Sequence, residues 1–193
     1  GNTTVVEAST DPYNNGLGKI QFVNAKGTED LLYASETPTT KGGIPAYVQF
    51  KFDHLLSKVK FSFTNGFLTD NVTLAVREVK MVVPSTGQVV LNGHDDYDWA
   101  LVEPTTNVVT LEFGDIEKAA RVAVGKKGYT DDERLTIPAG VDQQYKVTFV
   151  VDHYMGEKLL DTYNRTTYIK GCELLPGHAY NFTATLSAKN VSD

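Results

Sequence analysis

The stretch that decides the fold is YVQFKFDHLLSKVKFSFT, residues 47–64. Polar and aromatic or aliphatic residues alternate at both of its ends, which is typical of β-strands in a sheet with one solvated face. Between these two runs the segment DHLLSK (53–58) interrupts the alternation and contains His54. We interpret this segment as a structural corner where the chain crosses between sheets, with Leu55 or Leu56 filling the end of the core. A catalytic insert around the histidine is the weaker interpretation.

In the rest of the chain, hydrophobic and polar residues alternate with the same period of two residues. An interruption is expected near Arg77, and PSTG (84–87) is expected to turn residues 79–92 into a hairpin. Only 53–58 and 114–124 look helical, each for a turn or two at most. Together the runs predict nine or ten strands and an all-β sandwich with antiparallel pairing. The expected strands outside the quoted stretch are 19–24, 71–83, 88–92, 107–113, 133–138, 144–154, 166–171 and 178–188, and residues 30–35 form a further apolar patch.

Length and composition predict a single domain with a short extension. The chain has 193 residues, of which 41% are hydrophobic and 22% are charged, as in an ordinary globular protein. Residues 1–18 are polar and rich in turn formers, so we expect an N-terminal arm there, followed by one β-sandwich domain over 19–193. Residues 36–45 contain two prolines and two glycines and are expected to form a loop.

Charge and cysteine content exclude several classes of partner. The net charge of −6 and the lack of a basic cluster argue against nucleic acids and anionic membrane surfaces as partners. The mature chain is not expected to span a membrane, because no apolar run is long enough. The single cysteine, Cys172, permits no internal disulfide and no thiolate-rich zinc site, and we expect it to be a buried structural residue.

No catalytic motif is found in the sequence. It contains no GxSxG elbow, no P-loop, no GxGxxG and no HExxH. The four histidines stand alone, and the two that follow an aspartate, His54 and His153, would point to the opposite face of a strand from that aspartate. We therefore predict a protein that is not an enzyme, with no catalytic residue, cofactor or bound metal.

One acidic and aromatic segment, NGHDDYDWA (92–100), is expected to be a loop and offers an alternative function. Its aspartates carry oxygen ligands suited to calcium, although their spacing does not match an EF-hand loop. Tyr97 and Trp99 in the same segment can provide a stacking platform for a sugar ring, which would make the chain a glycan-binding β-sandwich module. The other interpretation is that Trp99 anchors the core or covers the end of the sandwich. The three aspartates are Asp95, Asp96 and Asp98.

The corner itself resembles a motif of the fimbrillin-like family of Bacteroidetes surface proteins, which includes fimbrial subunits, anchor proteins and cell-adhesion proteins. EDLLYA (29–34) and LLPGHAYNFTATL (174–186) are similar to other segments of that family, so the resemblance covers roughly residues 29–188. The residues that match the family's corner motif are Phe52, His54, Leu56, Ser57, Lys58 and Val59.

The resemblance implies a transthyretin-like antiparallel β-sandwich with Greek-key connections. It also implies a non-enzymatic surface adhesin or fimbrial component that offers sheet edges and loops for docking. Such proteins are exported to the cell surface and outer membrane, often with a lipid anchor on a removed N-terminal segment. They assemble with other fimbrial subunits by strand addition. Only KNVSD follows the expected closing strand, and residues 1–44 contain no arginine for cleavage. We therefore expect a single-domain member or one domain of a longer protein.

Overall fold

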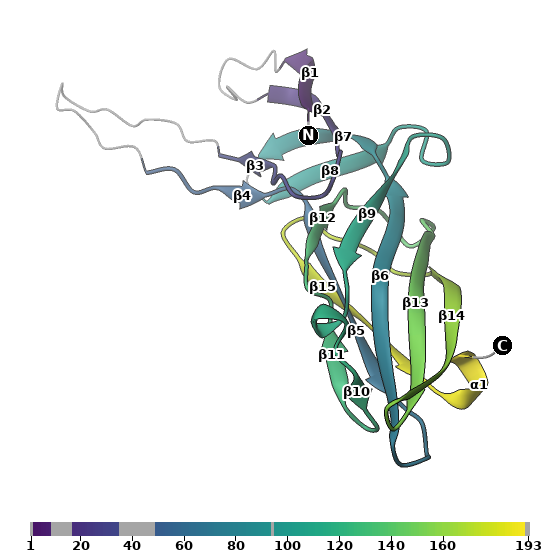
Figure 1. The fold of residues 1–193 in the computed structure, drawn as a ribbon. Coiled ribbons are helices and arrows are strands. Elements are labelled where there is room, and N and C mark those ends of the chain that lie inside the picture. Colours follow the sequence, from purple (N-terminus) through teal and green to yellow (C-terminus); the bar gives the residue numbers. More distant parts are fainter. Residues whose placement is uncertain (1, 9–16, 35–48, 94, 192–193) are drawn as a thin grey trace.

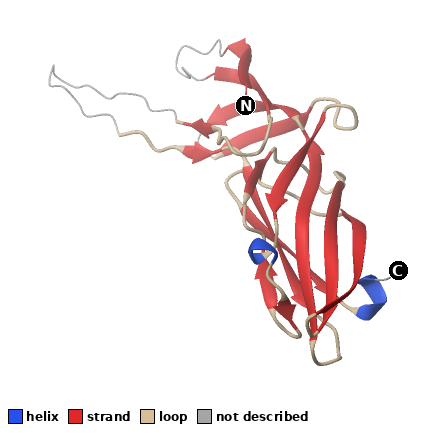
Figure 2. Ribbon diagram, in the orientation of Figure 1, coloured by secondary structure: helices blue, strands red, loops and turns tan. Residues whose placement is uncertain are grey.

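The computed structural model of this protein describes residues 2–8, 17–34, 49–93 and 95–191. Strands dominate these residues, and each of the two helical elements is about one turn long (Figure 2). The expected loop at 36–45, the residues Tyr47 and Val48, and His94 lie outside the described residues. In chain order the elements are β1 (Asn2–Ala8), β2 (Leu17–Val23), β3 (Leu32–Tyr33), β4 (Asp53–His54), β5 (Ser57–Asn65), β6 (Val72–Pro84), β7 (Thr86–Gly93), β8 (Asp96–Leu101), β9 (Val108–Gly114), η1 (Glu117–Ala119), β10 (Val122–Ala123), β11 (Lys127–Tyr129), β12 (Arg134–Thr136), β13 (Tyr145–Met155), β14 (Lys158–Ile169), β15 (Ala179–Leu186) and α1 (Ala188–Val191).

The main body is a sandwich of two sheets (Figure 1). One layer has the strand order β10-β6-β13-β14, and β9 also pairs with β6. In the other layer β11 and β12 pair with different halves of β5, and β15 pairs along its full length. The inward residues of β5, such as Phe61 and Phe63, meet those of β13, such as Val147 and Phe149, in one large core. The all-β sandwich expected from the sequence is confirmed.

One pairing departs from the expected antiparallel arrangement, because β15 runs parallel to β5. The cause is the route of the chain after β14. Residues 170–178 cross the end of the sandwich, and the N–H of Lys58 donates a hydrogen bond to the carbonyl of His178 over 2.9 Å. β15 therefore starts beside the start of β5, and the two strands run in the same direction.

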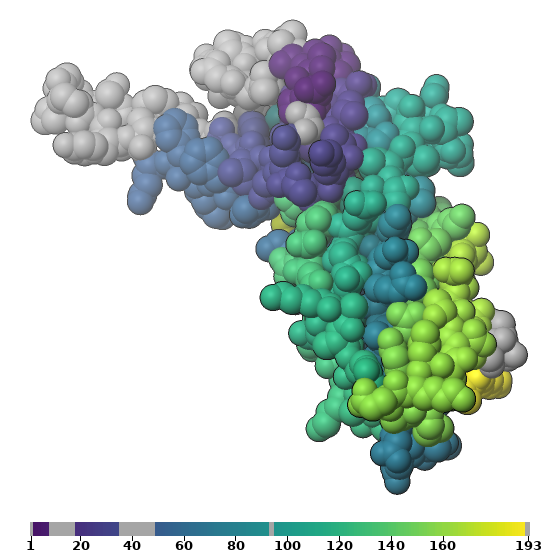
Figure 3. All heavy atoms as spheres, in the orientation of Figure 1, coloured from purple at the N-terminus to yellow at the C-terminus, as the bar shows by residue number. Residues whose placement is uncertain are grey.

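A smaller sheet with the order β1-β2-β7-β8 lies at one end of the sandwich. Figure 3 shows its purple to teal atoms above the green and yellow atoms of the main body, in contact with them. Its buried residues form two small clusters, one around Leu55 and Val89 and one around Phe22, Leu56 and Ile137. The two-stranded β3–β4 sheet lies beside it (Figure 1).

The prediction of a hairpin over residues 79–92 is wrong. β6 belongs to the main sandwich and β7 to the small sheet, so the chain crosses between sheets at Ser85 instead of turning back. The backbone hydrogen bonds of Ser85 explain this. Its N–H donates to the carbonyl of Asn107, and its carbonyl accepts from the N–H of Asn24. Ser85 is therefore held between two other segments in an extended connection.

Three further expectations are corrected. Residues 49–52 are not a strand, although they alternate, and 53–58 form β4 and the start of β5 without a helical turn. The segment 92–100, expected as a loop, contains the end of β7 and most of β8, and these two strands pair with each other. In contrast, the interruption near Arg77 is confirmed as an irregularity at Glu78, which has a φ of +56°. In 114–124 the only helical element is η1.

Residues 2–8, which were expected to belong to an arm, pair with β2 as strand β1. The side chains of residues 2–7 are exposed. The division into an arm over 1–18 and one domain over 19–193 stays a prediction.

Candidate functional site

The corner between β4 and β5 is built as a packed junction. Leu55 and Leu56 are 0% and 1% exposed and point into the two small clusters. Ser57 is fully buried, and its hydroxyl donates to the carbonyl of Leu175 over 2.7 Å. The corner therefore ties the start of β5 to the segment that enters β15, and these leucines take part in packing rather than in chemistry.

The polar residues of the corner lie at its surface. His54 Nδ1 lies 2.5 Å from Asp30 Oδ2, which joins the two segments that pair as β3 and β4. Lys58 Nζ lies 3.6 Å from a carboxylate oxygen of Glu133. Phe52 is 60% exposed and contributes nothing to the core. His54 and Lys58 thus each have a carboxylate partner within the protein.

Tyr97 and Trp99 lie on β8 with half-buried rings. Trp99 packs against both small clusters, and its Nε1–H donates to the carbonyl of Leu55 over 3.0 Å. The hydroxyl of Tyr97 donates to Asp53. Burial, aided by this hydrogen bond, raises the pKa of Tyr97 well above its ordinary value, so the hydroxyl stays protonated. Both polar groups are therefore engaged within the protein.

A pocket of about 560 Å³ lies between the corner and the β7–β8 turn. It brings Tyr97 together with Asp95 and Asp96, whereas Trp99 does not line it. Asp98 instead accepts a hydrogen bond from Asn92 over 3.1 Å. Within residues 2–8, 17–34, 49–93 and 95–191, no group of three or more His, Cys, Asp or Glu side chains could hold a metal ion. The remaining residues that line the pocket are Phe52, Asp53, His54, Leu175, Pro176, Gly177 and His178.

The other candidate groups lie apart from one another. The ring of His153 packs 4.8 Å from that of Phe67. His178 Nδ1 lies 2.8 Å from the carbonyl oxygen of Pro176. Cys172 is half-buried and packs against the main core, and burial raises the pKa of its thiol. Burial therefore keeps this thiol in its less reactive protonated form.

The feature that sequence reasoning could not locate is the open side of the sandwich. Among the described residues, β14 pairs only with β13 and β15 only with β5, so each layer ends in an edge strand. Residues of both edge strands line one pocket, so the two edges lie on the same side. Most residues of both strands are exposed. An edge strand presents N–H and C=O groups that no neighbouring strand satisfies, and this side of the molecule has two such edges.

An apolar groove of about 220 Å³ lies between these two edges. We call it the seam groove. Aromatic rings form its floor: Phe63 and Phe149 lie 4.8 Å apart, and Phe61 and Phe182 lie 5.6 Å apart, measured between ring centroids. The remaining residues that line it are Ser62, Val147, Thr167, Tyr168, Ile169, Thr183 and Ala184.

The sequence alone indicates some of the residues that form this groove. The alternation in 178–188 and 144–154 correctly places Phe182 and Phe149 on inward faces. What it does not contain is the parallel placement of β15, because hydrophobic period does not specify which strands become neighbours.

Comparison with known proteins was made at the level of family and of fold. The sequence profile of the family described as fimbrillin-like matches residues 3–193. No curated protein matches the sequence. Among the described residues, none of the helices is long and apolar enough to cross a membrane.

Several solved structures are similar, among them three from Bacteroides species. A fimbrial protein from Bacteroides vulgatus has a TM-score of 0.50 at 16% identity, with 98% of this chain and 73% of that chain covered. A candidate cell adhesion protein from Bacteroides fragilis gives 0.49 at 14% identity, with 89% and 60% covered. Another, from Bacteroides uniformis, gives 0.47 at 18% identity, with 89% and 62% covered. This chain thus spans less than two thirds of the length of the last two proteins.

Proposed function

The chain belongs to the fimbrillin-like family, and we propose that it is a non-enzymatic cell-surface adhesin or fimbrial component that docks other surface proteins by strand addition. It is exported, and a lipid anchor on a removed N-terminal segment would hold it at the outer membrane. The observation that carries the proposal is the seam groove between the edges of β14 and β15.

The groove has both features that strand addition requires. The open edges of β14 and β15 offer main-chain hydrogen bonds to an extended segment. The aromatic floor offers pockets for alternate side chains of that segment, because successive residues of a strand point to opposite faces. An added strand would cover apolar surface and satisfy backbone groups in one step.

Site-specific photo-cross-linking in cells that make the protein tests this proposal. A photoreactive residue at Ala184 would face the groove, and one at Asn181 would lie on the opposite face of the same strand. We expect a cross-linked protein partner from position 184 and none from position 181. Equal adducts from both positions, or none from position 184 in surface-exposed protein, would contradict docking at the groove. Retention of the native protein inside the cell would contradict the surface role itself.

Glycan binding is a second candidate function, because the pocket beside the β7–β8 turn brings Tyr97 together with exposed Phe52 and with three aspartates. Aromatic faces and carboxylates are the groups that bind sugar rings. A glycan array with the wild-type chain and a Phe52→Ala variant tests this idea, because Phe52 can be removed without disturbing the core. Binding that is absent, or that does not depend on Phe52, would argue against a site in this pocket.

A further inference from the structure

We propose that Arg165 makes the seam groove selective for partner strands that carry an acidic side chain. This inference rests on the proposed docking function and specifies the chemistry of the partner. The occupant that we infer is an extended segment of a partner protein, with apolar side chains for the aromatic floor and a carboxylate beside Arg165.

Arg165 is the one arginine without a carboxylate in the described part of the chain. The other three each have one: Arg77 with Asp152 at 3.0 Å, Arg121 with Glu157 at 3.1 Å, and Arg134 with Asp132 at 3.4 Å. Arg165 instead contacts an aromatic ring, since its guanidinium carbon lies 5.4 Å from the ring centroid of Tyr163. Its Nε atom is buried and has no hydrogen-bond partner.

Arg165 does not line the groove itself, but its position on β14 places it next to residues that do. On β14, Tyr163 and Ile169 pack against the main core, and Arg165 has the same parity, so it belongs to the inward face. Its partner in the β13–β14 register is Phe149, which lines the groove. Thr167, the next residue on the same face, also lines the groove. The cation thus lies beside the floor, on an edge strand.

The chemistry follows from this placement. A buried guanidinium N–H without an acceptor costs free energy, and an incoming carboxylate would remove that cost. A guanidinium also binds carboxylates in a planar, two-bonded geometry that a neutral side chain cannot reproduce. A lysine in the incoming strand would place two positive charges together. The groove should therefore prefer a strand with glutamate or aspartate at this point and reject one with lysine.

Binding of strand peptides to the folded protein tests the inference. The probes are peptides of alternating valine and threonine, in which one valine after another is replaced by glutamate, glutamine or lysine. The variants are Arg165→Gln and Arg165→Glu. Arg121→Glu is the matched control, because Arg121 already has a carboxylate partner, Glu157, at the turn after β13. Fluorescence anisotropy gives the affinities, and circular dichroism checks that each variant is folded.

We expect a glutamate peptide to bind wild-type protein roughly tenfold more tightly than its glutamine counterpart. The Arg165→Gln variant should lose this difference, Arg165→Glu should favour the lysine peptide, and Arg121→Glu should behave as wild type. Peptides that bind without regard to charge, in wild type and variants alike, would overturn the role of Arg165 while leaving strand docking intact. If no peptide binds, docking at the groove itself is contradicted, and this inference fails with it.

Discussion

Phe52 and Phe61 belong to the same quoted stretch, yet only Phe61 lies in the core. Phe61 is 4% exposed, and its ring meets that of Phe113 at a centroid distance of 4.9 Å. Phe52 is 60% exposed, with its neighbour Phe50 at 55%. The alternating pattern therefore shows which residues share a face of the strand. It does not show whether another layer of the protein covers that face.

Because of this difference in burial, we expect alanine substitutions at the two positions to reduce stability by different amounts. Phe61→Ala should destabilise the protein by about 3–5 kcal/mol, because it leaves a cavity in the core. Phe52→Ala should change the free energy of unfolding by no more than about 0.5 kcal/mol, as for other exposed positions. Urea denaturation followed by circular dichroism gives both values. Similar losses from the two substitutions would contradict the assignment of Phe52 to the surface.

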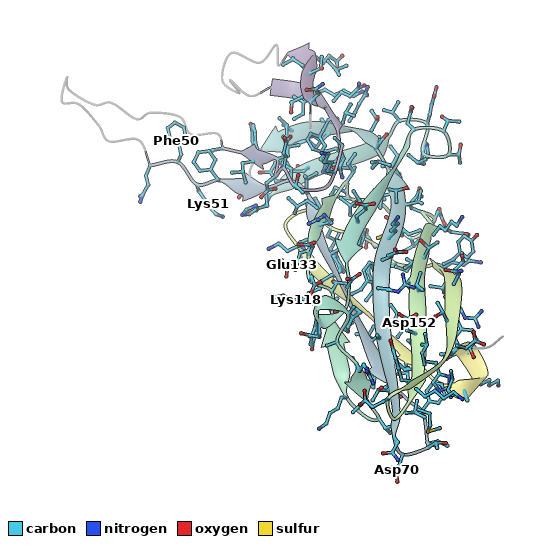
Figure 4. All side chains as sticks on the ribbon, in the orientation of Figure 1. Phe50, Lys51, Asp70, Lys118, Glu133 and Asp152 are labelled. Atoms are coloured by element: carbon cyan, nitrogen blue, oxygen red, sulfur yellow. The ribbon has the colours of Figure 1, made fainter. Side chains whose placement is uncertain are left out.

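The Asp152 carboxyl should make the stability of the folded protein depend on pH. Burial raises the pKa of its carboxyl, but hydrogen bonds from Arg77 and Thr162 outweigh burial, so the net pKa is below the ordinary value. A carboxyl with a lowered folded pKa contributes stability above its unfolded pKa of about 3.9, and this contribution is lost as pH falls through the folded pKa. Asp152, labelled in Figure 4, connects β13 to both of its neighbours.

The corresponding variant is Asp152→Asn. At pH 7 it should cost about 1 kcal/mol, a modest value because the Arg77 side chain is partly exposed. The difference from wild type should shrink below about pH 4, since the wild-type carboxylate then becomes protonated. Denaturation at pH 7, 5 and 3 measures it. A difference that is constant over this range would show that the carboxylate charge is not what stabilises the three strands.

At the scale of elements, the small sheet depends on Leu55 far more than on β1. Leu55 is fully buried under Trp99, and its carbonyl accepts the indole N–H. The described side chains of β1 are exposed, and its pairing with β2 has two irregularities. β1 therefore contributes edge hydrogen bonds, whereas Leu55 contributes packing.

The single tryptophan makes this contrast measurable. Leu55→Ala should cost about 2–5 kcal/mol and shift the emission of Trp99 to longer wavelength, because the cavity admits water near the ring. Deletion of residues 1–8 should leave the emission unchanged. If the deletion shifts the emission as far as Leu55→Ala does, β1 is part of the packed sheet and the expected arm is contradicted.

Individual strands could be predicted from the sequence, but the connections and contacts between distant segments could not. The strands 57–65 and 145–155 were predictable because one apolar face alternates along their whole length. The chain crossing at Ser85 was not, since a Pro-Ser-Thr-Gly segment fits a turn and its true partners, Asn24 and Asn107, are distant in the sequence. The half-buried state of Tyr97 and Trp99 depends on the corner packing against β8, which no local pattern specifies.

For the whole molecule, the decisive property is that the sandwich closes on one side and stays open on the other. On the closed side an antiparallel bridge between Ile116 and Thr130 joins the segments of the two layers. On the open side β14 and β15 face solvent with the seam groove between them. The fold class followed from hydrophobic period, but this asymmetry follows from connections between distant strands.

Hydrogen exchange tests the central claim most directly, by comparing the protein alone with the same protein in its surface assembly. In the isolated protein, amides of β6 and β13 should be the most protected, because both strands have neighbours on both sides. In the assembly, new protection should appear on the amides of β14 and β15, because a docked strand occupies their free edges. New protection confined to other surfaces, with β14 and β15 exchanging as before, would contradict docking at the open side.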